Sequence, residues 1–365
     1  MKRAAKKRWI TLLSIVAVML FFGVTSFGKD LARPRIVKDR VVVGYVYLQS
    51  GSESVMRQYQ QVKIEAKHRN WKLVEACGTS DEMLRNGFNN LINQNVDVII
   101  IGNVSTRPLE DLIVKARGKG IGVYNIDAEM RPGVIANCTQ PNGVAALELF
   151  YWLGERMNWK GTFAVITVPS IQVNIERTAP VTALIEEVFP GLEKLGEEYV
   201  NPNEPVMDQA FNYSKRWITK HGDKLDIIFS SWDGGAQGAA NAIMQAGYEG
   251  KVATVGIDGG SNTWAMIRKG TPFIASYAQP FELYTHSIFE LVNQIQVKGL
   301  NPGDKGCSIS GYGSTLYERG YIVHTQNVPQ PGQSVHAVFN YYGGDPDDPN
   351  AWYNWKEEGG PYMVQ

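Results

Sequence analysis

The feature that most constrains the fold is an alternation of apolar runs with amphipathic segments, which occurs twice along the chain. Residues 96–101 (VDVIII) form an apolar run without polar alternation, as expected for a strand buried on both faces. Segments such as 54–70 carry apolar residues at helical spacing. The alternation restarts after residue 140. This order predicts an α/β fold with two similar lobes, each a parallel sheet covered by helices.

The individual elements follow from the same periodicity. The first half predicts strands at 41–46, 72–76, 96–101 and 121–126, and helices at 54–70, 82–94 and 109–119. The second half predicts strands at 162–168, 225–231, 252–257 and 273–278, and helices at 143–157, 179–189, 209–221, 236–246, 263–269 and 281–298. Residues 343–365 are rich in Gly, Pro and aromatic residues, and we expect an irregular tail there.

The N-terminus has the pattern of an export signal. Five basic residues lie among the first eight, and an uncharged stretch with an apolar centre at 10–22 follows up to Gly28. We expect residues 1–28 to be a signal peptide; an uncleaved membrane anchor is the alternative, because about 20 uncharged residues can span a bilayer. Either reading places the body in the periplasm or another extracytoplasmic space. Without those five bases, 31 basic residues face 36 acidic ones, so the body has no electrostatic reason to bind nucleic acid.

The cysteines and histidines give no sign of a metal or a cofactor. Cys77, Cys138 and Cys307 lack metal-type spacing and are too few for a disulfide scaffold, and the five histidines are also without such spacing. Outside the cytoplasm a Cys77–Cys138 disulfide can form. The alternative is that each cysteine is a buried small hydrophobic residue.

Candidate site residues follow the predicted strands, because ligands of open α/β sheets bind beyond the carboxyl ends of the strands. The polar and aromatic candidates at these ends are Tyr47, Ser52, Asn103, Asp127, Asn174, Trp232, Asp233, Asp258 and Gln279. A carboxylate suits the paired hydroxyls of a diol, an arginine donates in fork geometry, and an aromatic face covers the C–H side of a sugar ring. A single aspartate here is equally well explained as a helix cap or turn residue. Three aspartates at strand ends, without a histidine or a nucleophile–base pair, predict binding of a polyol rather than catalysis.

Several segments carry a resemblance to a known family. Residues 230–279 (SSWDGGAQGAANAIMQAGYEGKVATVGIDGGSNTWAMIRKGTPFIASYAQ), with VVVGYVYLQSGS, VDVIIIGNVS, GIGVYNID and NIERTAPVTAL, resemble the type I periplasmic sugar-binding proteins, such as the ribose- and galactose-binding components of ABC transporters. The resemblance covers about residues 40–300. It implies two Rossmann-like lobes joined by a three-segment hinge. We expect lobe one to comprise 40–139 plus 280–310, and lobe two 140–279 plus 311–342.

The resemblance also assigns roles to particular residues. Asp127, Arg177, Asp258 in the sequence GIDG, and Gln279 match family positions that contact the sugar. Asp233 matches an acid that is more often structural than in contact.

Three departures from the ribose-binding pattern bear on the ligand. Ala128, Trp232 and Ile257 stand where ribose binders have Arg, Asn and Phe. The first loop also differs, since the GSES stretch at 51–54 stands where ribose binders have an Asn and a paired Phe. We therefore expect a pocket that is not a copy of a ribose site and has room for a different or larger ligand. Trp232 is a candidate for stacking on the ligand, or packs within the protein.

We expect an exported receptor that captures a carbohydrate or polyol between its lobes and closes by a hinge. It would deliver the solute to an ABC permease, or present it to a chemoreceptor, as a monomer without cofactor or catalytic residues. Two alternatives stay open: a sensor subunit with the same ligand chemistry, and a glycoside hydrolase with paired carboxylates.

Overall fold

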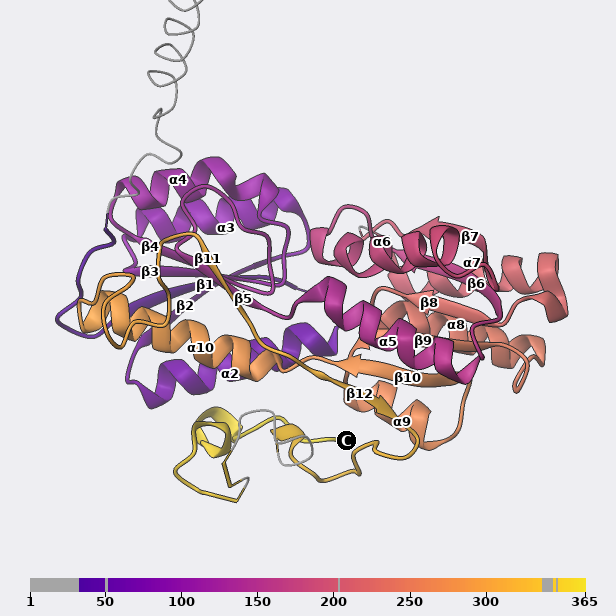
Figure 1. Cartoon of the computed structure of the whole chain (residues 1–365). Helices are drawn as coiled ribbons and strands as arrows, with labels where there is room; N and C mark the ends of the chain where they lie inside the picture. The colour runs from indigo at the N-terminus through magenta and orange to yellow at the C-terminus, as the bar shows by residue number, and fades with distance from the viewer. Residues whose placement is uncertain (1–32, 50–51, 203, 337–343, 346) are drawn as a thin grey trace, which may run out of the picture. The chain divides into compact units, whose positions relative to one another are not determined.

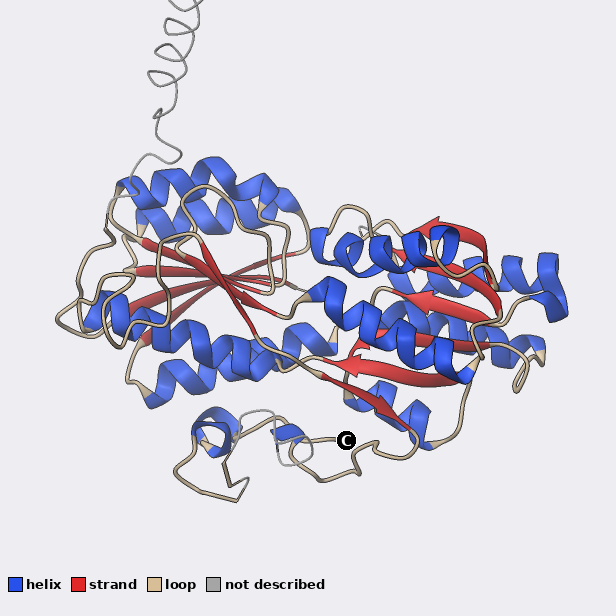
Figure 2. Ribbon diagram, viewed as in Figure 1, coloured by secondary structure: helices blue, strands red, loops and turns tan. Residues whose placement is uncertain are grey.

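The computed structural model describes residues 33–49, 52–202, 204–336, 344–345 and 347–365. Within these residues the chain forms two six-stranded sheets flanked by helices on both faces (Figures 1 and 2). We call the first sheet with its helices lobe one and the second lobe two. The expected signal peptide, residues 1–28, lies outside the described residues. None of the described helices combines the length and the apolar character that a membrane crossing requires.

Lobe one is built on a fully parallel sheet in the order β11-β5-β4-β3-β1-β2. Its strands are β1 (Val42–Leu48), β2 (Lys72–Gly78), β3 (Val98–Gly102), β4 (Gly122–Ile126), β5 (Ala136–Thr139) and β11 (Ser314–Tyr317). Its helices are α2 (Glu53–His68), α3 (Asp81–Asn93), α4 (Glu110–Gly118) and α10 (Phe281–Val292), which continues as a π-helical turn over Asn293–Val297. On β3, Ile100 packs toward α2 and α10, whereas Ile99 and Ile101 pack toward α3 and α4. The uninterrupted apolar run therefore corresponds to a strand buried on both faces.

Lobe two has the order β12-β10-β9-β8-β6-β7, in which only the edge strand β12 is antiparallel. Its strands are β6 (Gly161–Thr167), β7 (Leu192–Tyr199), β8 (Ile227–Ser230), β9 (Ala253–Asp258), β10 (Phe273–Ala278) and β12 (Tyr321–His324). Its helices are α5 (Asn142–Arg156), α6 (Gln172–Glu187), α7 (Val206–His221), α8 (Asp233–Ala246) and α9 (Ser261–Arg268). One core lies on the α5 and α6 side of the sheet and another on the α7 and α8 side.

The described chain passes between the lobes after β5, after β10 and after β11. The expected α/β fold with two lobes and a three-segment hinge is therefore confirmed. One boundary differs: β11 pairs with β5, Ser314 opposite Ala136, so residues 314–317 belong to lobe one and not to lobe two as expected. The tail contains two short 3₁₀ helices, Trp352–Asn354 and Glu357–Gly359.

The three cysteines are free, so the Cys77–Cys138 disulfide is absent. Cys77 lies on β2 and Cys138 on β5, and the sheet order places three strands between these two. At roughly 4.8 Å per strand spacing the two lie about 19 Å apart, well beyond the 7 Å or so that a disulfide tolerates. Cys138 is fully buried and packs as a small hydrophobic residue in the core of lobe one.

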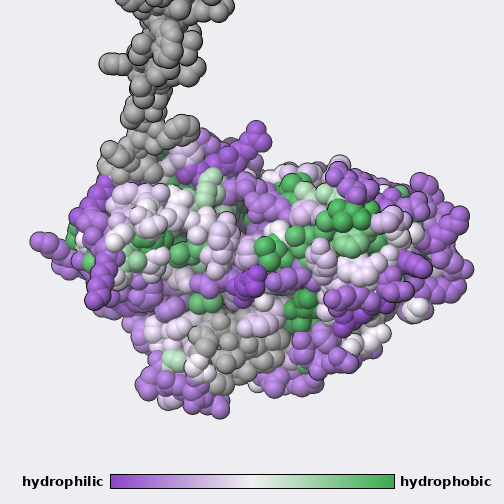
Figure 3. Space-filling model, viewed as in Figure 1, coloured by the Kyte–Doolittle hydropathy of each residue, from purple (hydrophilic) through white to green (hydrophobic). Residues whose placement is uncertain are grey.

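The face of the molecule that Figure 3 shows is mostly hydrophilic, with hydrophobic residues in separate patches. Exposed apolar residues that are scattered in this way are normal and mark no particular site. The features that bear on function lie instead in the cavities beyond the strand ends.

Candidate functional site

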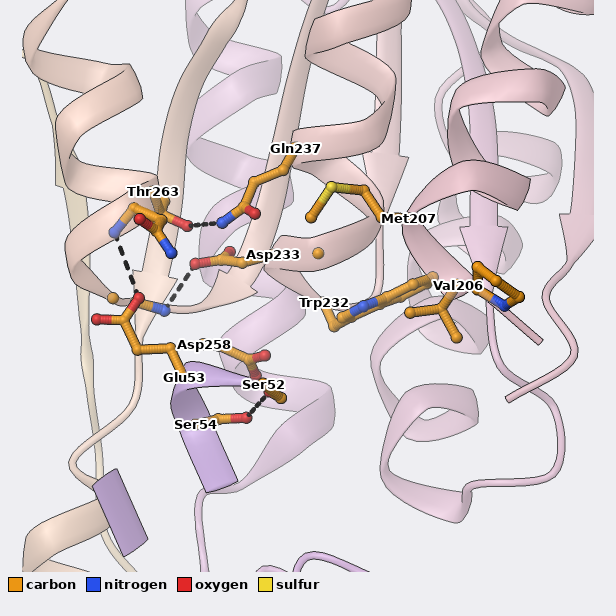
Figure 4. A pocket seen from close by; sticks show the side chains of 15 residues that line it. Ser52, Glu53, Ser54, Val206, Met207, Trp232, Asp233, Gln237, Asp258 and Thr263 are labelled. Carbon is orange, nitrogen blue, oxygen red and sulfur yellow. Dashed lines mark hydrogen bonds between the residues drawn. The ribbon is translucent and has the colours of Figure 1, made fainter. Parts of the chain in front are cut away.

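Two adjoining cavities of about 350 Å³ each lie where the carboxyl ends of the strands of both lobes meet. The first, here called the central cavity, is lined by Asp127 and Asn103 of lobe one and by Asn174, Arg177 and Asp258 of lobe two. The second, the adjacent cavity, is shown in Figure 4. Both share the lining residues Ser52, Ser54, Pro205, Val206, Trp232 and Asp258, so they are two parts of one cleft.

Arg177 on α6 is the charged centre of the central cavity. The side chain is almost fully buried; Nε donates to Asn142 Oδ1 at 2.8 Å, and Nη1 donates to the Ser231 carbonyl at 2.9 Å. Nη1 also lies 3.4 Å from Asp258 Oδ1. These hydrogen bonds hold the guanidinium in one orientation in the cavity.

Asp127 and Asp258 face this guanidinium from different lobes. Asp127 follows β4 in lobe one and accepts the Thr139 hydroxyl at 2.6 Å. Asp258 ends β9 in lobe two and accepts Gln279 Nε2 at 2.7 Å. Gln279 is fully buried and does not line either cavity, so its role here is to orient Asp258.

The central cavity is lined by more acidic than basic side chains, and burial acts on the two aspartates that face Arg177. Burial raises the pKa of Asp258 to about 7, an effect that the positive charge of Arg177 opposes and the charges of Asp233 and Asp127 reinforce. Burial also raises the pKa of Asp127, again opposed by Arg177. Hydroxyl groups that donate to these oxygens would stabilise the charged forms. The carboxyl oxygens of the site therefore suit a ligand that donates several hydrogen bonds.

Asp233 holds the loop that carries Asp258. Its carboxyl accepts the Gly259 amide at 2.9 Å and the Ser276 hydroxyl at 2.7 Å. Burial raises its pKa to about 6, against the hydrogen bond from Ser276. Asp233 lines the adjacent cavity but its oxygens are used within the protein, so it is a positioning residue for the Asp258 loop.

Trp232 lines both cavities, and Figure 4 shows its side chain in the adjacent one. It precedes α8, and its ring lies over Gly234 and Gly235. A Cβ on Gly235 would come within 2.8 Å of the ring atom Cη2, so glycine is required for this close approach. Val206 also lines both cavities, and Met207 lines the adjacent one. The ring is thus held in place as an aromatic surface facing the cleft.

Asn174 contributes an unused hydrogen-bond acceptor. Its side chain is 5% exposed, lines the central cavity, and its Oδ1 has no hydrogen-bond partner among the described residues. A buried acceptor without a partner costs about 1–3 kcal/mol, which a donor on a ligand would recover.

The structure brings together all but one of the candidates at or directly behind the cleft: Ser52, Asn103, Asp127, Asn174, Arg177, Trp232, Asp233, Asp258 and Gln279. Tyr47 is the exception, and its prediction as a pocket residue is wrong. Its ring stacks between those of Tyr45 and Tyr59, with centroids 5.0 Å from each, and its hydroxyl donates to Glu75. Because side chains alternate along a strand, Leu48 rather than Tyr47 faces the cleft.

Several lining residues were not anticipated, among them Glu53, Pro205, Val206 and Gln237. Pro205 and Val206 follow β7, a strand that the periodicity did not reveal; an assignment of β7 would have directed attention to the loop after it. Among the described residues, no group of three or more His, Cys, Asp or Glu side chains is placed to hold a metal ion.

Comparison with known proteins finds relatives that each match part of the chain. The chain is 29% identical to the xylitol-binding protein of Mycolicibacterium smegmatis over 197 residues, which are 53% of this chain and 55% of that protein. It therefore spans little more than half the length of that relative. It is 23% identical over 225 residues, 61% of this chain, to the D-xylose-binding periplasmic protein of Escherichia coli, of which they make up 67%.

The fold is that of solved solute-binding proteins. An ABC transporter solute-binding protein from Agrobacterium vitis with bound allitol matches 80% of this chain and 98% of its own, with a TM-score of 0.70 and 19% identity. A sugar ABC transporter protein from Yersinia enterocolitica matches 87% and 94%, with a TM-score of 0.72 and 20% identity. The family model described as "Periplasmic binding protein domain" matches residues 43–299. The chain belongs to the periplasmic binding protein family.

Proposed function

We propose that this protein is an extracytoplasmic receptor that captures a neutral carbohydrate or polyol between its two lobes. The observation that carries the proposal is that Asp127 of lobe one lines the same cavity as Asn174, Arg177 and Asp258 of lobe two. A ligand in this cavity would receive and donate hydrogen bonds on both sides, so its binding would favour closure about the hinge.

The charge of the cleft supports a neutral ligand. Asp127, Asp258 and Glu204 line the central cavity, and Arg177 is the basic side chain among its lining residues. The Arg177 guanidinium already donates hydrogen bonds to Asn142, the Ser231 carbonyl and Asp258. A phosphorylated or carboxylated solute would add negative charge to this excess, whereas hydroxyl groups suit carboxylate acceptors.

Similar proteins support the polyol class. Two relatives are named for xylitol and for D-xylose, and a protein of similar fold has bound allitol. The Trp232 ring adds the apolar surface that the C–H face of such a ligand needs.

We propose binding without chemical conversion. A glycosidase needs a carboxylic acid and a carboxylate that are free to act on opposite sides of one bond. Here the Asp233 carboxyl accepts hydrogen bonds from Gly259 and Ser276. The Asp258 carboxyl accepts one from Gln279 and forms an ion pair with Arg177. The closed protein would then pass its ligand to an ABC permease, and residues 1–28 would direct its export.

A thermal-shift screen of the purified protein against pentoses, hexoses, pentitols, hexitols and disaccharides tests this proposal. A ligand at 100 times its dissociation constant adds about 2.7 kcal/mol of stability, which is a readily visible shift. We expect a clear shift with one stereoisomer and a smaller one with its epimer. No shift with any sugar or polyol, or release of product from a glycoside in the same panel, would refute the proposal.

A further inference from the structure

The end of the chain, residues 352–365, lies beyond the span that the family model matches and contacts both lobes; we call it the strap. Figure 1 shows this segment in yellow beside α2, α10 and α9. On lobe one, the His68 ring stacks on Trp355 with centroids 3.5 Å apart, and His68 Nδ1 lies 2.9 Å from Glu357 Oε1. The His286 ring of α10 stacks on Trp352 at 4.1 Å.

The last residues of the strap attach to α9 of lobe two. The Gln365 amide donates to Ser261 Oγ at 3.0 Å, and Arg268 Nη2 donates to the Gln365 carbonyl at 3.1 Å. Val364 and Tyr362 pack in an apolar cluster around the fully buried Trp264. The strap is therefore fixed at both ends to different lobes.

Glu53 joins the two lobes and the strap at one carboxylate. Glu53 begins α2 in lobe one and accepts the backbone amides of Ser261 at 2.5 Å and Asn262 at 3.3 Å in lobe two. The Tyr362 hydroxyl of the strap donates to the same carboxylate. Figure 4 shows Glu53 reaching across to the start of α9.

Arg57, one helical turn after Glu53 on α2, makes a second contact between the lobes. Arg57 of α2 is fully buried, forms a 2.7 Å ion pair with Glu282, and donates to the Gly259 carbonyl of lobe two at 2.7 Å. Its guanidinium carbon lies 5.8 Å from the centre of the Tyr362 ring. Tyr362 thus contacts both side chains by which α2 reaches the Asp258 loop.

These contacts lie next to the ligand cleft. Ser52 and Ser54, on either side of Glu53, line both cavities, and residues 258–260, which lead into Ser261, line the adjacent cavity. We propose that the strap positions these two loops, 52–54 and 258–262, relative to each other before ligand binds. Loops that are fixed in advance lose less freedom on binding, so affinity rises. The effect on affinity rests on the proposed function, whereas the positioning of the loops does not.

The test compares hydrogen exchange in the full chain without ligand, for wild type and Tyr362→Phe, with Tyr317→Phe as the matched control. Tyr317 is 63% exposed on β11. Loss of a hydrogen bond to a carboxylate should speed exchange at the amides of Ser261 and Asn262 about tenfold in Tyr362→Phe. Exchange in β3 and β8 should stay unchanged, as should every peptide of the control.

Unchanged exchange at 261–262 would overturn the proposal, and so would an equal increase in the core strands of both lobes, since the strap would then only add general stability. In a parallel arm, the wild type and both variants are titrated with xylitol. We expect weaker binding in Tyr362→Phe alone, and equal affinity in all three would overturn the link between strap and affinity. If the wild type bound neither xylitol nor any other polyol, the proposed function would fail, while the exchange data would still decide the role of the strap.

Discussion

Replacing Asp258 by Asn should stabilise the ligand-free protein while it weakens ligand binding. The carboxyl oxygen accepts hydrogen bonds from Gln279 and Arg177, and the amide oxygen of asparagine can accept both. Burial raises the pKa of Asp258 from 3.8 to about 7. The folded protein therefore keeps a proton that the unfolded chain has already released, and the carboxyl lowers stability progressively as pH rises from about 4 to about 7.

The size of this effect follows from the same values. At 1.36 kcal/mol per pKa unit, the rise corresponds to about 4 kcal/mol above pH 7. The side chain keeps 16% exposure, and water screens part of the cost, so we expect about half of it, or about 2 kcal/mol. With an unfolding entropy of about 2.1 cal/mol/K per residue, a gain of about 2 kcal/mol raises the Tm of a 365-residue chain by about 3 °C at pH 8.

Thermal unfolding of wild type and Asp258→Asn at pH 5, 6, 7 and 8, without ligand, measures this difference. The gain should be largest at pH 7–8 and shrink toward pH 5. Affinity for the best polyol should fall about 10- to 100-fold in the same variant, because a neutral amide replaces a charged acceptor. A lower Tm for Asp258→Asn at pH 8, or a gain that does not depend on pH, would refute the reasoning.

Three further predictions concern other parts of the molecule. Arg177→Met should lower stability by about 3–5 kcal/mol in chemical denaturation, because it leaves Asp127 and Asp258 without a buried positive partner; a loss below 1 kcal/mol would contradict this role. Trp232→Ala should weaken polyol binding about tenfold in calorimetry if the ring covers the ligand, and unchanged affinity would assign the ring to packing alone. Unreduced protein in denaturant should show three reactive thiols, and a count of one would reveal a disulfide.

The strands and helices that carry the site were predictable because their burial is one-sided or complete. The strands β3 (VIIIG), β8 (IIFS) and β9 (ATVGID) are wholly or mostly buried and lie at the centre of each sheet. The strands that periodicity missed are β5, β7, β11 and β12. Of these, β7 (LEKLGEEY), β11 and β12 are edge strands, and a half-exposed edge can carry charged residues without losing its pairing. Helix α6 begins at Gln172, seven residues before the expected start.

The site was predictable where a strand end alone fixes position, as for Asp127 and Asp258. It was not predictable where the face of a strand decides. Tyr47 and Leu48 are neighbours in sequence, and only the register of β1 in the folded sheet shows that Leu48 faces the cleft. The role of Glu53 could not be predicted for a different reason, because its partners Ser261 and Tyr362 are far away in sequence.

The central claim is that one ligand is held by groups from both lobes. Calorimetric titration of wild type, Asp127→Ala and Asn174→Ala with the polyol that gives the largest thermal shift tests it most directly. Asp127 belongs to lobe one and Asn174 to lobe two, and both line the central cavity. The account predicts one ligand per chain for wild type and affinity at least tenfold weaker in each variant. Wild-type affinity in either variant would show that the ligand does not bridge the lobes at this cavity.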